Sequence, residues 1–223
     1  MANICKSIVI GFVASMLLPF QGLCQPKVVV EGEAIYVLSQ KGDRTLVGTE
    51  PFLKETALSE DGKRLAILRG ADPSELEIVI MRVSEMGVQL EWLIKGPVQC
   101  EEYKLPFEGT LQWSPNGERL YLMAEFSATS AYLLVVEPET RQARCLVPVI
   151  TYAVISSCKS EYTGYLVGLL RKHKVLHPYY WYWLLDAEGR EVRPIGEDTD
   201  LVEFIDTYKV RLYARTVGRL EGK

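Results

Sequence analysis

The two histidines of the chain, His173 and His177, are four positions apart in the segment 171–178, RKHKVLHP. On a helix this spacing would place both imidazoles on one face, as in many metal sites. The context argues against a metal, because the segment carries three further positive charges and Pro178 favours extended backbone in the residue before it. We therefore expect a solvated basic loop, with no bound metal and no cofactor.

Motifs for nucleophilic catalysis are missing as well. The sequence contains no Gly-x-Ser-x-Gly nucleophile elbow and no glycine-rich phosphate loop. Carboxylates at Glu101, Glu102 and Glu108, near Trp92, could line the mouth of a glycosidase-like site. A solvated linker between structural units is the favoured alternative, because paired catalytic carboxylates need a fixed separation. The sequence thus favours a protein that is not an enzyme.

Two octapeptides define an internal repeat that must position any site. Residues 58–65, LSEDGKRL, and residues 113–120, WSPNGERL, follow one pattern, and their serines are 55 positions apart. Each pairs Asp-Gly or Asn-Gly, where a tight turn needs a positive φ, with an arginine and an apolar run, which predicts a β-hairpin. A hairpin repeat of about 40 to 55 residues is typical of β-propeller blades, which bury both faces only when neighbours stack on them. The turn residues are Asp61, Gly62, Asn116 and Gly117.

This repeat resembles the TolB-like and WD40-like propeller repeats, whose signature reads approximately apolar-Ser-Pro-Asp-Gly-Lys-x-Leu-Ala. The resemblance covers the two hairpins at 58–65 and 113–120, and later copies are degenerate. Such signatures occur in periplasmic Tol components, in the propellers of serine peptidases and in secreted proteins. The resemblance therefore implies a fold and not an activity.

Strand and turn signals along the chain are sufficient for four blades. Residues 55–97 and 109–148 each hold a hairpin and two more strands, and residues 152–195 repeat this order without the signature. The remaining strands are predicted at 34–38, 45–48, 202–205 and 209–217. We expect an all-β, four-bladed ring closed by these terminal strands, with no helix beyond the signal region. An open stack that dimerises through its edges is the alternative.

The N-terminus has the organisation of a secretory signal peptide. Lys6 precedes an apolar run over 8–18, and Pro19 interrupts it before it is long enough to span a membrane. We expect a signal peptide over residues 1–24 that includes this segment as a helix. The mature protein is then a single domain over residues 25–223, periplasmic or secreted.

Cys24 also allows a lipoprotein interpretation, in which acylation of this cysteine holds the protein to a membrane. The preceding residues, QGL at 21–23, fit a lipoprotein signal poorly, so cleavage without lipidation is preferred. Removal of residues 1–24 takes Lys6 away and changes the formal net charge from −4 to −5. A mildly acidic chain without a basic cluster argues against a nucleic-acid partner.

Three cysteines remain after processing, Cys100, Cys145 and Cys158. An odd number in an oxidising compartment allows at most one intramolecular disulfide. We favour Cys145–Cys158, because these residues should end one blade and begin the next. Three buried thiols acting as small hydrophobic residues are the alternative.

The aromatic run YYWYW at 179–183 would place large rings on both faces of a strand. Packing between blades is the favoured interpretation, and a binding patch is the alternative. We expect a non-catalytic module that binds a protein or peptide in the cell envelope through one rim. A hydrolase or hydrolase accessory domain for carbohydrate or peptide is the alternative. The candidate contact residues are Arg69, Asp72, Glu125, Lys172, His173, Tyr180 and Tyr182.

Overall fold

The computed structural model describes residues 27–31, 33–38, 42–84, 87–127, 129–157, 159–174 and 177–212. The expected signal peptide with Cys24, the thiol of Cys158 and positions 213–217 of the expected last strand lie outside the described residues. Among those that are described, no helix is long and apolar enough to cross a membrane.

Three four-stranded antiparallel sheets follow one another along the chain, each with its strands in chain order. The first comprises β4 (Leu53–Leu58), β5 (Arg64–Arg69), β6 (Glu77–Ser84) and β7 (Gly87–Lys95). The second comprises β10 (Phe107–Trp113), β11 (Leu120–Ser127), β12 (Ser130–Glu137) and β13 (Gln142–Val149). The third comprises β14 (Thr151–Val154), β15 (Leu166–Lys174), β16 (His177–Leu185) and β17 (Glu191–Gly196).

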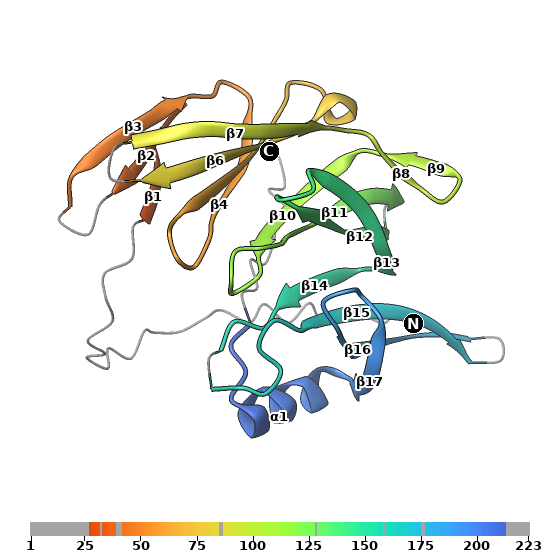
Figure 1. Ribbon diagram of the computed structural model, residues 1–223. Coiled ribbons are helices and arrows are strands. Elements are labelled where there is room, and N and C mark those ends of the chain that lie inside the picture. The colour runs from red at the N-terminus through yellow and green to blue at the C-terminus, as the bar shows by residue number, and fades with distance from the viewer. Residues whose placement is uncertain are drawn as a thin grey trace, which may run out of the picture.

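Smaller elements precede and join these sheets. A three-stranded sheet of β1 (Lys27–Glu31), β2 (Ala34–Leu38) and β3 (Arg44–Thr49) comes first. A short 3-10 helix, η1 (Pro73–Glu75), lies between β5 and β6, and the hairpin β8 (Val98–Cys100) and β9 (Tyr103–Leu105) joins the first two four-stranded sheets. Figure 1 shows the sheets side by side around an arc. The expected all-β, propeller-like architecture is confirmed.

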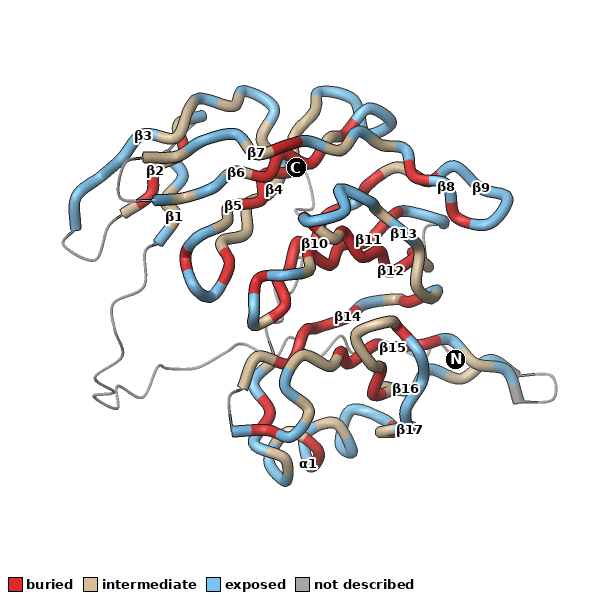
Figure 2. The backbone as a smooth tube through the Cα atoms, viewed as in Figure 1, coloured by how far each residue is buried: buried red, intermediate tan, exposed pale blue. Residues whose placement is uncertain are grey.

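The hydrophobic core lies in layers between successive sheets. Along β11, Leu120, Leu122 and Ala124 pack toward the β4–β7 sheet, whereas Tyr121 and Met123 pack toward the β14–β17 sheet. This alternation follows from the two-residue period of a strand, which lets a central sheet serve two cores. Figure 2 shows the buried segments concentrated in the strands where the sheets face one another. The repeated hairpins therefore stabilise each other only when stacked.

The expected strand at 202–205 is wrong, because these residues belong to the helix α1 (Asp198–Tyr208). The expected strand at 209–217 is wrong over its described part, residues 209–212, which hold only an isolated bridge at Leu212. Leu201, Phe204, Ile205 and Tyr208 pack with the β14–β17 sheet. Their spacing of three, four and seven positions is a helical period rather than a strand period. The expectation of no helix beyond the signal region is wrong for the same reason.

Over the residues that the structure describes, ring closure by paired terminal strands is wrong too. The helix α1 covers the face of the last sheet on which a further blade would pack (Figure 1). After it, Leu212 forms an isolated bridge with Ile155 at the end of β14, and the N-terminal strands form a sheet of their own. A terminal repeat that is capped by a different element ends the array, as in solenoid proteins.

The disulfide joins Cys100 to Cys145, with a Cα–Cα distance of 5.6 Å. The preference for Cys145–Cys158 is therefore wrong. The connection between the first two four-stranded sheets folds back as the β8–β9 hairpin against β13. This long-range contact brings Cys100 to Cys145, although 45 positions separate them in the sequence.

Candidate functional site

The first signature turn, between β4 and β5, is held by its own side chains. Ser59 Oγ accepts a hydrogen bond from the backbone N–H of Arg64 at 2.9 Å and donates one to Asp61 Oδ1 at 2.7 Å. Gly62 has a φ of 71°, as the Asp-Gly pattern predicts. The turn presents the Arg64 side chain toward the next sheet.

The second signature turn, between β10 and β11, repeats this geometry. Ser114 Oγ accepts from the backbone N–H of Arg119 at 3.0 Å and donates to Asn116 Oδ1 at 2.7 Å. Gly117 has a φ of 68°. The positive φ predicted for both turn glycines is confirmed. The repeat in the sequence is therefore also a repeat in the structure.

The arginine of each turn reaches the sheet that follows. Arg64 Nη1 donates to the carbonyl oxygen of Gly117 at 2.9 Å. Arg119 Nη1 donates to the carbonyl oxygen of Ala187 at 3.0 Å, and its Nη2 lies 2.6 Å from Glu188 Oε1. Each arginine therefore bridges two sheets on the same rim of the arc.

The third sheet departs from this pattern. The backbone N–H of Ile155 donates to the carbonyl oxygen of Tyr165, as Ser114 does to Arg119 in the second sheet. Tyr165 thus occupies the place of the bridging arginine, and its ring packs in the cluster that contains Phe204 of α1. The series of arginine contacts between successive sheets therefore ends at the third sheet, which α1 covers.

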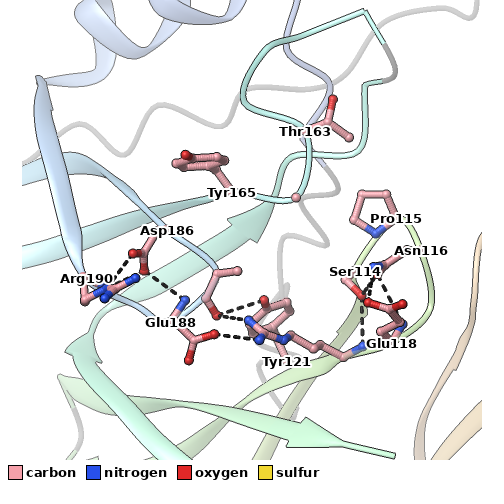
Figure 3. A pocket seen from close by; sticks show the side chains of 13 residues that line it. Ser114, Pro115, Asn116, Glu118, Tyr121, Thr163, Tyr165, Asp186, Glu188 and Arg190 are labelled. Carbon is pink, nitrogen blue, oxygen red and sulfur yellow. Dashed lines mark hydrogen bonds and ion pairs between the residues drawn. The ribbon is translucent and has the colours of Figure 1, made fainter.

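A pocket of about 570 Å³ opens on this rim between the second and third four-stranded sheets. Figure 3 shows three segments around it: the 114–119 turn, the end of the loop before β15 and the turn between β16 and β17. We call it the rim groove. Its lining residues are Ser114, Pro115, Asn116, Glu118, Arg119, Tyr121, Thr163, Gly164, Tyr165, Asp186, Ala187, Glu188 and Arg190.

The charges in the rim groove are fixed by local partners. Burial alone would raise the pKa of Glu188, but its contacts with Arg119 and Arg144 outweigh this effect and hold the pKa below its usual value. The pKa of Asp186 is also lowered, because hydrogen bonds from the backbone and side chain of Arg190 outweigh its burial. Both carboxylates are therefore ionised at neutral pH.

A buried phenol lies behind these charges. Tyr121 is fully buried, and its hydroxyl donates to the carbonyl oxygen of Ala187 at 3.2 Å. Burial raises the pKa of Tyr121, despite the opposing contact with Arg119. The groove thus combines a neutral hydroxyl with paired charges. Glu118 and Arg190 are exposed at its mouth.

Of the candidate contact residues, the two in the first four-stranded sheet have structural partners. Arg69 Nη1 binds both carboxylate oxygens of Glu50, at 2.6 and 2.7 Å, and its Nε donates to Glu77 at 2.7 Å. Asp72 accepts from the backbone N–H of Ser74 at 2.8 Å and begins η1. Both charges are therefore engaged with neighbouring groups of the chain.

The remaining candidates are spread over the other two sheets. Glu125 is exposed on β11, and His173 is exposed on β15. Lys172 forms an ion pair with Glu191, and its Nζ lies 4.9 Å from the centre of the Trp183 ring. These residues, like Arg69 and Asp72, are outside the rim groove.

The aromatic run fulfils its expected role in part. Trp183 packs against the core between the second and third four-stranded sheets, and Tyr182 packs in the cluster beneath α1. Tyr180 and Trp181 are 49% and 36% exposed, so the expectation of packing between blades is wrong for them. Tyr180 shares the face of Tyr182, which α1 covers only in part, whereas Trp181 shares the face of Trp183.

The other chemistry-bearing residues are separated. His173 lies on β15 and His177 on the facing strand β16, so the basic segment is a hairpin rather than a loop. Trp92, expected near the carboxylates of a glycosidase-like site, is buried in the core, away from solvent.

One of these carboxylates, Glu108, has a raised pKa, because of its burial and the charge of Glu125. In the part of the chain that the structure describes, no group of three or more His, Cys, Asp or Glu side chains could hold a metal ion.

The rim-groove residues were not among the predicted contacts. One signal pointed to them: an arginine recurs five positions after the serine in both signature turns, at Arg64 and Arg119. A charge repeated at one place in a structural repeat indicates a repeated contact. The turn at 186–190 that receives Arg119 belongs to another hairpin and carries no shared motif.

No protein-family model matches the sequence, and no curated protein does either. Among solved structures, the chain is similar to dipeptidyl peptidase 4 of Porphyromonas gingivalis, with a TM-score of 0.54 and 12% identity over 78% of this chain and 31% of that one. It is similar to an uncharacterized protein of Listeria monocytogenes, with a TM-score of 0.50 and 10% identity over 77% and 51% of the two chains. It is also similar to TolB from Acinetobacter baumannii, with a TM-score of 0.46 and 14% identity over 74% and 38%.

The chain thus spans between 31% and 51% of the lengths of these proteins. Identities of 10 to 14% concern the fold alone and carry no activity from one protein to the other. With its successive four-stranded antiparallel sheets, the fold is of the β-propeller kind.

Proposed function

We propose that the protein is an exported, non-catalytic module that binds a segment of a protein or peptide in the rim groove. The observation that carries this proposal is the groove between the second and third four-stranded sheets, whose walls are turns held by internal hydrogen bonds. Preformed walls lose little conformational entropy on binding.

The size and chemistry of the groove suit a peptide. Its volume of about 570 Å³ is within the range of ligand sites in proteins. Pro115 and Tyr165 offer apolar surface, and Glu118 offers a negative charge at the mouth. Arg190 is exposed there too, with its Nε bound to Asp186 at 2.6 Å. A short segment with one basic and one acidic side chain would find a partner for each of them.

The pKa shifts in the groove support binding rather than catalysis. General acid–base catalysis at neutral pH needs a carboxyl group whose pKa is raised toward 7. The pKa values of Asp186 and Glu188 are instead lowered by their arginine partners. Such carboxylates stay ionised and offer a permanent negative charge to a ligand.

Export is part of the proposal and rests on the N-terminal pattern. Lys6, the apolar run that follows and the small residues before Gln25 are typical of a secretory signal peptide. A protein processed in this way would meet its partner in the periplasm or outside the cell.

A displayed peptide library tests the proposal. Protein produced from the full-length sequence should select peptides that share a motif. Glu118→Arg or Arg190→Glu should weaken the binding of these peptides about tenfold or more, because each variant reverses a charge at the mouth of the groove. Lys104→Glu, on the exposed β9 strand, is the matched control and should bind normally. No enrichment, or binding that both mouth variants leave intact, would refute a groove that binds peptides. Hydrolysis of the enriched peptides would favour the hydrolase alternative.

A further inference from the structure

Over the described residues, the strand β1 is an edge strand of the three-stranded sheet β1–β3. It pairs with β2 along all five residues, from Lys27 with Leu38 to Glu31 with Ala34, without a bulge. On its other side no strand of the described chain is paired with it. Val30 is 42% exposed there.

This edge is where an innermost strand would lie, and none of the described strands occupies it. The last strand of the second four-stranded sheet, β13, leads directly to β14, the first strand of the third. The strand β3 leads in the same way to β4 through residues 50–52, so it corresponds to a fourth strand and β1 to a second strand. A cavity of about 330 Å³ lies at this position, between Val30 and the Leu53–Thr56 segment of β4.

The outermost strands of the three four-stranded sheets are protected in ways that β1 is not. Register shifts interrupt the pairing of β7, β13 and β17 with their neighbours. In addition, β13 contains Pro148 and β17 contains Pro194. Bulges and prolines on edge strands prevent pairing with another chain. The regular edge of β1 has neither device.

The sequence of β1 is complementary to itself. In an antiparallel pair centred on Val29, Lys27 of one strand faces Glu31 of the other, Val28 faces Val30, and the two copies of Val29 face each other. Two opposite-charge pairs and three valine pairs each favour cross-strand pairing. Glu31 already binds Arg44 at 2.7 Å, so its carboxylate is oriented on the sheet.

We propose that two copies of this chain form a two-fold symmetric dimer in which their β1 strands pair antiparallel about Val29. Each copy places its β1 strand beside the β1 strand of the other, in the innermost position that none of the described strands occupies. The pairing removes both exposed edges and joins the two three-stranded sheets into one sheet. With the expected signal peptide cleaved after Cys24, only Gln25 and Pro26 precede the strand.

Charge reversal across the dyad tests this proposal by sedimentation equilibrium, with protein produced from the full-length sequence. Lys27→Glu alone places two pairs of acids together, and Glu31→Lys alone places two pairs of lysines together. Each should raise the dimer dissociation constant roughly tenfold or more. An equimolar mixture of the two variants restores both opposite-charge pairs and should dimerise again. Lys104→Glu should leave dimerisation unchanged.

A cysteine on the dyad gives a second, independent measurement. Val29→Cys should form a disulfide-linked dimer under mild oxidation, because the two β-carbons lie about 5 Å apart across the pair. Leu46→Cys, at a 55% exposed position on β3, should not form one. A protein that remains monomeric at the highest attainable concentration overturns the proposal. A dimer that neither charge reversal weakens overturns it as well.

Discussion

Arg64, from the first copy of the repeat, donates a hydrogen bond to the carbonyl oxygen of Gly117 in the second copy, at 2.9 Å. The contact joins equivalent turns of neighbouring sheets and is extended by an ion pair between Arg64 and Glu139. Arg119 makes the next link, to Ala187. The repeat motif thus contains its own connection to the following blade.

We expect Arg64→Ala to lower the free energy of unfolding by about 1 to 3 kcal/mol, because a charged donor is lost between two sheets. Urea denaturation monitored by tryptophan fluorescence measures the change. Lys63→Gln at the adjacent exposed position is the control and should cost little. Equal losses from the two variants would contradict a bridge specific to Arg64.

Gly117→Val should cost about 1 to 3 kcal/mol, because a β-branched residue is strained at a φ of 68°. The new Cβ would also lie 3.4 Å from Ser59 Cβ. Gly62→Val, at a φ of 71°, should behave alike. Gly48→Ala has no neighbour within 4 Å of the added Cβ and should be nearly neutral. Thermal unfolding curves of the three variants measure these changes in stability. Equal losses in all three would contradict strain at the two turn glycines.

Phe204→Ala should destabilise the protein by about 3 kcal/mol, because this side chain is buried between α1 and the last sheet. Val202, on the same helix, is 58% exposed, and Val202→Ala should change stability little. If both variants unfold at the same urea concentration as the original protein, α1 does not cap the array in solution.

Reduction of the Cys100–Cys145 disulfide should lower stability by about 3 to 4 kcal/mol, since it opens a loop of 45 residues in the unfolded chain. Denaturation with and without dithiothreitol measures this loss. Cys158→Ser should leave the effect intact, whereas Cys145→Ser should abolish it. Peptide mapping without reduction should recover Cys100 and Cys145 in one fragment, and recovery of Cys145 with Cys158 would refute this assignment.

Acid should remove the stabilisation from the Asp186 and Glu188 contacts. Their folded-state pKa values are lowered below the unfolded values of about 4, so the stabilisation is full above that pH and declines as pH falls through the folded values. Asp186→Asn should therefore be less stable than the original protein at pH 7. The difference should shrink below about pH 4, as measured by urea denaturation across the pH range. A difference that is constant with pH would contradict ionised contacts.

Local patterns predicted most of the strands. The Ser-x-x-Gly-x-Arg turns marked the hairpins at Gly62 and Gly117, and the two-residue period marked the strands that follow them. These signals are reliable because turn geometry and strand alternation depend on neighbours in the chain. The same local information was present for α1, where Leu201, Phe204 and Tyr208 follow a helical period. Ring closure by terminal strands would require a strand at this place, and the helical period of these residues contradicts it.

The sequence by itself determined the repeating β-hairpins, the positive-φ turns and the propeller-like class, because these depend on residues a few positions apart. The tertiary structure decided that Cys100 meets Cys145, that Arg119 meets the turn at 186–190, and that Phe204 of α1 packs on β15 and β16. Each of these contacts joins segments that are distant in the chain. Their formation depends on how whole sheets stack, which no local pattern records.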